Sequence, residues 1–166
     1  MEIETKEDKK QRKALDSLLS ECRMVLPGIQ ALFGFQLISI FSEGFETRLH
    51  PEERIFHLVA LVLVACAVAL VMAPAACHRQ AGAPEVSERL LRLASALLLA
   101  SMVPLGLATC IELYIVARVI LGERILPILI ASFMVLALAT LWYLVPRLHA
   151  RRGRTIRSRE VETARS

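Results

Sequence analysis

Four long apolar stretches, almost free of charged residues, alternate with short charged segments along the chain. They cover residues 24–42, 55–76, 90–119 and 125–145. Each has a charge-free core of about 19–21 residues, which matches the roughly 20 that a helix needs to cross the hydrocarbon layer of a bilayer. Strands of a membrane barrel would alternate apolar and polar residues and be about half as long. The pattern therefore predicts an all-α membrane protein, with a four-transmembrane-helix bundle over residues 24–146.

The segments before and after this bundle are rich in charge. Within the first of them, residues 1–23, apolar side chains recur at the i, i+3, i+4 and i+7 spacing of one helical face. These side chains are Leu15, Leu18, Leu19 and Cys22. We expect an N-terminal amphipathic helix from about residue 6, lying at the membrane surface or packed under the bundle. The helix-weakening pair Pro27-Gly28 predicts its joint with the first span, and residues 147–166 form a basic C-terminal tail.

Lys and Arg residues are distributed unevenly between the two sides of the predicted bundle. Sixteen of the 20 lie in the N-terminal segment, the loop between spans two and three, and the tail, which share one side. The other side holds Arg48, Arg54, Arg118 and Arg124. Because positive residues favour the cytoplasmic side of a membrane, both termini are predicted to be cytoplasmic.

Small residues recur at every fourth position in the second and third spans. The second span carries Ala65, Ala69, Ala73 and Cys77, and the third carries Ala96, Ala100, Pro104 and Ala108. Small side chains at this spacing let two helix backbones approach closely. We therefore expect these two rows to be packing faces.

Polar and ionisable side chains inside a membrane are costly, so each one needs an explanation. Glu112 follows the charge-free run 93–111, which places it near the outer edge of the hydrocarbon. We expect an outward-facing polar pocket made of Gln36, Ser39, His57, Thr109 and Glu112. Its imidazole and carboxylate could bind a cation or pass protons. In the alternative, Glu112 reaches water or pairs with Arg118, and His57 lies among the lipid headgroups.

Charged residues also gather at the predicted cytoplasmic ends of the spans. They are Glu21, Arg23, His78, Arg79 and Arg92. Basic clusters next to membrane spans recognise anionic headgroups, so this cytoplasmic rim is a candidate site for an anionic lipid or a partner. The alternative is simple anchoring to headgroups, together with ion pairs within the rim.

Signatures of catalysis, cofactors and metals are missing from the sequence. There is no GxSxG, HExxH, P-loop or GxGxxG motif. The cysteines, Cys22, Cys66, Cys77 and Cys110, have no metal-ligand spacing, and we expect them to be small buried hydrophobic residues. The net charge of +4 comes without a basic surface that carries aromatic residues. We therefore expect no enzyme activity, no cofactor, no metal and no nucleic acid partner.

Two segments resemble a small bacterial family of four-span integral membrane proteins. The stretch ECRMVLPGIQALFGF, residues 21–35, resembles the opening of that family, and Ala73-Pro74 followed by His78-Arg79 resembles the end of its second span. The family has no known function, although similar sequences are sometimes labelled sodium:proton antiporters. The resemblance implies a multi-pass protein of the bacterial cytoplasmic (inner) membrane. It also adds Gln30 to the cytoplasmic rim.

Few buried charges in four spans favour a non-enzymatic integral membrane protein that acts through oligomerisation or a partner. The partners expected are the lipid bilayer with its anionic headgroups, and a second copy of the chain or another membrane protein. The alternative is a small cation or proton transporter, or a channel-like oligomer. Four spans of this length leave little room for a pathway in one copy, so transport would require several copies.

Overall fold

The computed structural model describes residues 6–81 and 88–144, without the side chains of residues 6–8, 78, 80 and 81. The described chain is helical and contains no strand. Its elements in order are α1 (Lys6–Ile40), α2 (Glu43–Arg48), α3 (Pro51–Ala81), α4 (Glu88–Leu121), α5 (Ile125–Ala139) and a single π-helical turn, η1 (Thr140–Leu144). The fold is thus the all-α bundle that the hydropathy pattern predicts.

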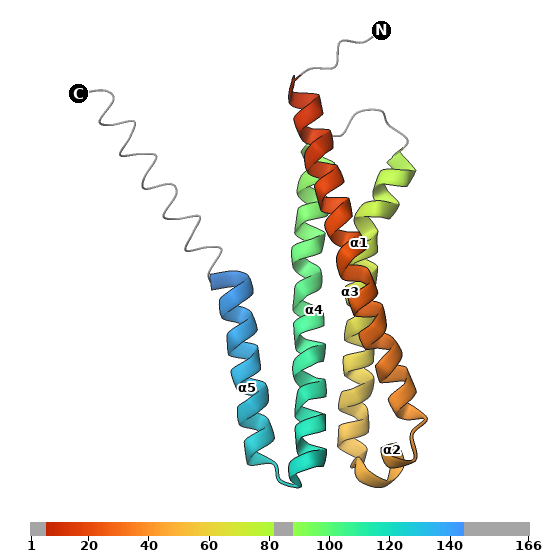
Figure 1. The fold of residues 1–166 in the computed structure, drawn as a ribbon, viewed down its shortest axis with the longest axis vertical. Coiled ribbons are helices and arrows are strands. Elements are labelled where there is room, and N and C mark those ends of the chain that lie inside the picture. The colour runs from red at the N-terminus through yellow and green to blue at the C-terminus, as the bar shows by residue number, and fades with distance from the viewer. Residues whose placement is uncertain (1–5, 82–87, 145–166) are drawn as a thin grey trace, which may run out of the picture.

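The four long helices run alternately up and down (Figure 1). The beginning of α1, the end of α3 and the beginning of α4 lie together at what we call the α1 end. The short helix α2, the beginning of α3 and the turn from α4 to α5 lie at the opposite, α2 end. The α2 end is the one that the Lys and Arg distribution predicts to face outward.

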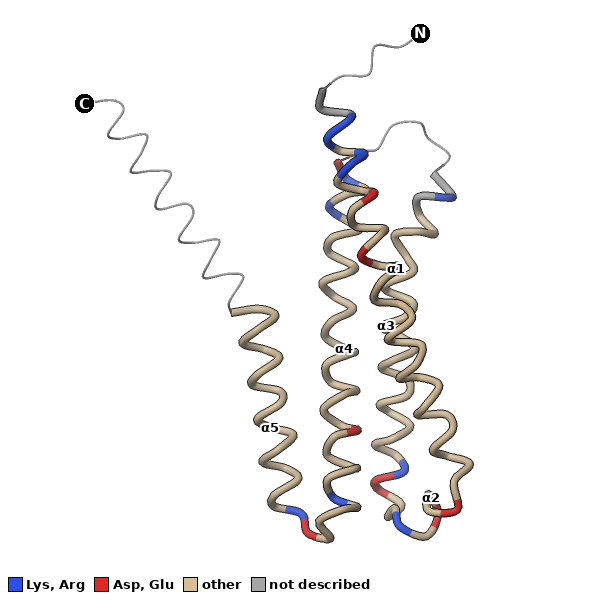
Figure 2. The backbone as a smooth tube through the Cα atoms, in the orientation of Figure 1, with Lys and Arg blue, Asp and Glu red and all other residues tan. Residues whose placement is uncertain are grey.

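Four helical segments are long and apolar enough to cross a membrane. They are Lys9–Ile40, Pro51–Cys77, Glu88–Leu121 and Ile125–Leu144. Figure 2 shows charged residues concentrated toward the two ends of the bundle, with a largely uncharged middle. The chain is therefore a multi-pass membrane protein with a four-helix bundle.

The first helix differs from the expected arrangement. No joint separates a surface helix from the first span, because α1 continues without a break from Lys6 to Ile40 with Pro27 inside it. A proline removes one backbone hydrogen bond, but neighbouring helices in a membrane bundle commonly keep such a helix intact. Residue 23 is therefore not a helix boundary. The basic tail, residues 147–166, lies outside the described residues.

Side-chain signals explain where α3 begins. Pro51 occupies the first helical position, where its missing N–H costs nothing and its backbone angle suits a helix. Two residues later, Glu53 reaches back, and its Oε2 accepts a hydrogen bond of 2.8 Å from the backbone N–H of His50. This is the carboxylate half of a capping box. The helix therefore starts four residues before the predicted span at residue 55.

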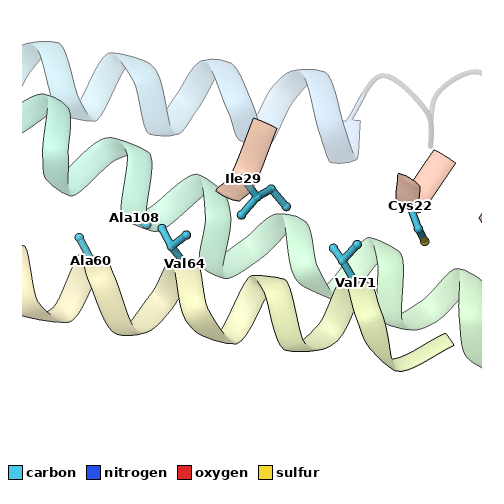
Figure 3. Packing of buried hydrophobic residues seen from close by; sticks show 6 residues of the cluster. All are labelled: Cys22, Ile29, Ala60, Val64, Val71 and Ala108. Atoms are coloured by element: carbon cyan, nitrogen blue, oxygen red, sulfur yellow. The ribbon is translucent and has the colours of Figure 1, made fainter. Parts of the chain in front are cut away.

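The apolar core lies where α1 crosses the α3–α4 pair. It contains Cys22, Ile29, Ala60, Val64, Val71 and Ala108, which Figure 3 shows along the facing sides of the three helices. The predicted packing rows are wrong for most of their length, because Ala65, Ala69, Ala96 and Ala100 are exposed, whereas Ala108 is buried in the core as expected. A row at every fourth residue drifts around a helix of 3.6 residues per turn. The buried row of α3 instead mixes steps of four and three, through Ala60, Val64, Ala67 and Val71.

Helix α5 packs against α4, and Gly106 is the point of close approach. A Cβ atom added to Gly106 would lie 3.1 Å from Trp142 Cζ3 and 3.5 Å from Leu138 Cδ1. We expect Gly106→Leu to push α5 and η1 away from α4, at a cost of about 1–3 kcal/mol for overpacking. Because Trp142 is the only tryptophan, its fluorescence emission reports this movement. Gly34→Leu is the control, since nothing lies within 4 Å of its added Cβ. Equal spectra for the two variants would contradict this packing.

Candidate functional site

Three helices bring polar side chains together near the α2 end. Gln36 and Ser39 come from the last turns of α1, His57 from the second turn of α3, and Glu112 from α4. We call these four residues the polar cluster. Gln36 and His57 are only 5% and 3% exposed, and the Glu112 side chain is 20% exposed. Such burial within membrane-spanning helices is costly unless the groups satisfy one another.

Glu112 is the point where the three helices meet. Its Oε1 accepts a hydrogen bond of 3.0 Å from Gln36 Nε2 on α1. The same oxygen lies 2.9 Å from His57 Nδ1 on α3. One carboxylate therefore ties α1 and α3 to α4 through charge-assisted contacts, which are the stronger class of hydrogen bond.

The surroundings of His57 determine where its protons sit. Its Nε2 lies 3.1 Å from the backbone carbonyl oxygen of Gln36, which can only accept. The Ser39 hydroxyl, 3.3 Å from Nε2, already donates to that carbonyl over 2.7 Å. Nε2 therefore carries a hydrogen and donates it. The contact between Nδ1 and Glu112 then needs one further proton, either on the imidazole or on the carboxyl group. The His57–Glu112 pair thus holds one proton between its two groups and has no net charge.

A pocket of about 280 Å³ adjoins this pair at the α2 end. His57 and Glu112 form part of its wall, together with Phe45 and Arg48 of α2 and residues of the last turns of α4. The Phe45 ring stands edge-on to the imidazole, at a centroid distance of 5.3 Å and an interplanar angle of 68°. In the opposite direction the apolar core begins with Ala60 and Ala108, about one turn from His57 and Glu112. The pair therefore lies between a pocket and a closed apolar contact.

A second charged pair lies nearer to the α2 end. Glu53 Oε1 is 3.4 Å from Arg118 Nε, and both side chains are largely buried, at 7% and 15% exposure. The Nε–H does not point at the carboxylate well enough for a hydrogen bond. Arg118 thus pairs with Glu53 rather than with Glu112, in contrast to the alternative considered from the sequence. The helix-start position of Glu53, two residues after Pro51, was the signal that could have identified it.

Glu53 thus combines a helix cap with an ion pair. We expect Glu53→Ala to destabilise the protein by about 1–3 kcal/mol, because the His50 N–H loses its acceptor and the buried Arg118 side chain loses the carboxylate of its ion pair. Glu53→Gln keeps an acceptor for the N–H and should cost less. Thermal unfolding in mild detergent, followed by circular dichroism, measures the difference. The control is Glu52→Ala at the neighbouring exposed position. An equal loss in Glu52→Ala and Glu53→Ala would contradict this role.

The predicted polar pocket and the polar cluster overlap in four of the five residues. Thr109 is the exception, because its hydroxyl donates to the carbonyl oxygen of Leu105 on its own helix over 2.9 Å. One hydrogen-bond acceptor of the cluster, Gln36 Oε1, is buried and has no hydrogen-bond donor among the described residues. Phe45 belongs to the site as well, and α2, which carries it, falls in a segment that the sequence predicts to be a loop.

The residues of the predicted cytoplasmic rim do not form one site. Arg23 and Arg79 line the same pocket between α1 and α3. Glu21 and Gln30 are exposed on α1, and Arg92 pairs with Glu88 on its own helix at 3.1 Å. The side chain of His78 lies outside the described residues. Of the described rim side chains, only Arg23 of α1 and Arg79 of α3 therefore lie at a common pocket.

The cysteines are free thiols, of which Cys22 and Cys110 are buried, Cys77 is half-buried and Cys66 is exposed. Within residues 6–81 and 88–144, no three His, Cys, Asp or Glu side chains are grouped so that they could hold a metal ion.

Comparison with known proteins gives a family and no relative with an assigned activity. Neither the curated proteins nor the solved structures include a match to the chain. The model of one protein family matches residues 3–146, which is most of the chain and includes every described helix. The chain therefore belongs to the family of unknown function DUF6328.

Proposed function

We propose that this protein is a non-enzymatic membrane protein that responds to protons and acts through a partner or a second copy of itself. The observation that supports this proposal most is the setting of His57. Its Nε2 faces a carbonyl oxygen and its Nδ1 faces a carboxylate oxygen, so the pair is satisfied only while it holds one proton. A group whose contacts depend on one proton can act as a switch.

Loss of the proton changes the contacts between the helices. With Nε2 still donating to Gln36, a bare Nδ1 would direct its lone pair at the ionised Glu112, and the two would repel each other across 2.9 Å. A second proton would instead leave a net positive charge in a largely buried site. Both changes weaken the tie between α1, α3 and α4. The outer turns of α1, held there through Gln36 and Ser39, are the part expected to move.

The apolar core supports a switch rather than a proton path through one copy. Below the polar cluster, α1, α3 and α4 pack through Ala60, Val64, Ile29 and Ala108, none of which can carry a proton. Polar side chains that are exposed to lipid tend to form hydrogen bonds with other membrane helices. When α1 loosens, Gln36 and His57 become available to a second copy or to another membrane protein. The proton would thereby control association.

The oligomeric state tests this function. The purified protein in mild detergent is expected to shift from monomer toward oligomer as the pH rises and the pair loses its proton. Glu112→Gln should keep one state across the series, because its amide nitrogen can donate at every pH to Nδ1 and, once the Gln36 amide turns over, to Gln36 Oε1. Light scattering coupled to size-exclusion chromatography measures the mass. A wild type whose mass and recovered partners do not change with pH would contradict the proposal.

A second candidate is transport of a proton or small cation by an oligomer. The pocket of about 280 Å³ favours it, because the pocket brings Glu112 and His57 within reach of a small ion from the α2 end. Proteoliposomes with a pH-sensitive dye inside are expected to show flux for the wild type and none for Glu112→Gln. Absence of flux from the wild type, with and without a sodium gradient, would exclude this candidate.

We also infer from the Lys and Arg distribution that the protein lies in the bacterial cytoplasmic membrane with both termini inside. Labelling of single engineered cysteines in intact cells tests this orientation. A site in the tail should stay unlabelled by an impermeant reagent, and a site in α2 should react.

A further inference from the structure

A groove runs between α1 and α3 near the α1 end, far from the polar cluster. It has a volume of about 250 Å³. Its floor is apolar and includes Leu26 from α1 together with Val71, Met72 and Ala75 from α3. Among the residues that the structure describes, Arg23 and Arg79 contribute the only charged side chains to its wall, one from each helix. The groove is thus amphipathic, with two cations beside an apolar floor.

Both arginines are available to a ligand. Their side chains are exposed, and no described carboxylate forms an ion pair with either of them. By contrast, Arg92 at the same end of the bundle is paired with Glu88, and Arg118 at the α2 end is paired with Glu53. Two unpaired guanidinium groups on one groove favour an anion, and their planar forks suit the oxygens of a phosphate group.

The position of the groove along the bundle matches the level of lipid headgroups. Arg79 follows His57 by 22 residues on the same helix, a rise of about 33 Å. The hydrocarbon layer of a bilayer is about 30 Å thick. With the polar cluster near one boundary of this layer, Arg79 therefore lies near the other. The distribution of Lys and Arg predicts that this boundary faces the cytoplasm, where anionic lipids meet basic residues.

We propose that this groove binds one anionic phospholipid, with its phosphate between Arg23 and Arg79 and the upper part of an acyl chain on the apolar floor. The proposal joins three separate features, which are charge complementarity, an apolar floor and placement at the headgroup level. It does not depend on the proton-linked function at the α2 end. A lipid held in this way bridges α1 and α3, so it also sets the spacing of the two helices at the α1 end.

Lipid titration of the purified full-length protein tests the site. Native mass spectrometry from mild detergent counts the lipids bound as phosphatidylglycerol or phosphatidylcholine is added. We expect one phosphatidylglycerol to bind tightly, and phosphatidylcholine to bind at least tenfold more weakly. Arg23→Gln and Arg79→Gln should each weaken phosphatidylglycerol binding by about fivefold. Arg92→Gln is the matched control, an exposed arginine at the same end that does not line the groove, and its affinity should equal that of the wild type.

Filling the floor distinguishes the groove from general attraction to a basic surface. Ala75→Leu keeps both arginines but occupies the space for the chain, so it should lower the affinity for phosphatidylglycerol at least fivefold. Inorganic phosphate alone should not raise the unfolding temperature, whereas phosphatidylglycerol should. The proposal is overturned if Arg92→Gln weakens binding as much as Arg23→Gln, or if Ala75→Leu binds like the wild type. Stabilisation by phosphate alone would overturn it too, since the site would then be one for the free anion.

Discussion

Glu112→Ala is expected to destabilise the bundle by about 2–4 kcal/mol, the largest effect of any single substitution that we propose. The carboxylate oxygen it removes serves Gln36 Nε2 at 3.0 Å and His57 Nδ1 at 2.9 Å. Both of those partners are buried, so in Glu112→Ala each would be left with a polar group that contacts neither water nor a hydrogen-bond partner. Unfolding in mixed detergent micelles, titrated with sodium dodecyl sulfate, measures this loss.

Two further variants separate the contacts from the space that the side chain fills. In Glu112→Gln the amide nitrogen can take the place of Oε1 and donate to Nδ1 and, once the Gln36 amide turns over, to Gln36 Oε1, so this variant should cost less than about 1 kcal/mol. The double variant His57→Leu/Glu112→Leu removes the polar pair together and should recover much of the loss, because apolar replacement of a whole buried pair is often neutral. If Glu112→Ala and Glu112→Gln unfold at the same detergent fraction, the proton-sharing contact contributes nothing to stability.

The stability of the wild type relative to Glu112→Gln is expected to be constant at acid pH and to fall as the pH rises. Stability falls with rising pH wherever the folded state binds more protons than the unfolded state, and it falls with decreasing pH wherever it binds fewer. The folded pair holds one proton, whereas the same two groups in the unfolded chain hold none at alkaline pH and two at acid pH. In folded Glu112→Gln the imidazole is neutral, so at acid pH both proteins bind one more proton when they unfold and the difference between them is constant. At alkaline pH only the wild type loses a proton when it unfolds, so the wild type should lose stability relative to the variant as the pH rises.

The comparison isolates the pair from its charged neighbours. Arg48 on α2, Glu53 on α3 and Arg118 on α4 surround the site and are the same in both proteins. Their own pH effects therefore cancel in the difference between the two unfolding curves. A difference that is constant from acid to alkaline pH would show that His57 and Glu112 do not share a titrating proton.

The sequence predicts the spans well because hydropathy reports on lipid exposure directly. All four apolar stretches became helices, and the Glu123-Arg124 turn joins α4 and α5 as a tight connection. The polar residues of the cluster could also be predicted, because a buried Glu or His in an apolar run has few possible explanations. Gln36, Ser39 and His57 each lie near the same end of a span as Glu112, so the alternating direction of the helices brings them together.

Other features depend on the rotation of the helices, which periodicity alone determines poorly. The spacing of small residues in α3 and α4 predicts that these rows face a neighbouring helix. A shift of one residue along the helix, about 100° of rotation, is enough to turn such a row toward the lipid. Continuity of α1 through Pro27 could not be predicted either, since it depends on the support of α3 and α4. The pairing of Arg118 with Glu53, and the donor role of His57 Nε2, require atomic distances.

The protonation of His57 can be measured directly by nitrogen-15 NMR of histidine-labelled protein in detergent, with His57→Asn used to assign its signals. We expect Nε2 to carry a hydrogen in the folded protein at every pH, and Nδ1 to show the shift of a nitrogen that shares a proton with a carboxyl group. The same spectrum of Glu112→Gln should show a neutral ring with Nδ1 as acceptor. A wild-type ring with a hydrogen on Nδ1 and a bare Nε2 would contradict the assignment of one shared proton to the His57–Glu112 pair.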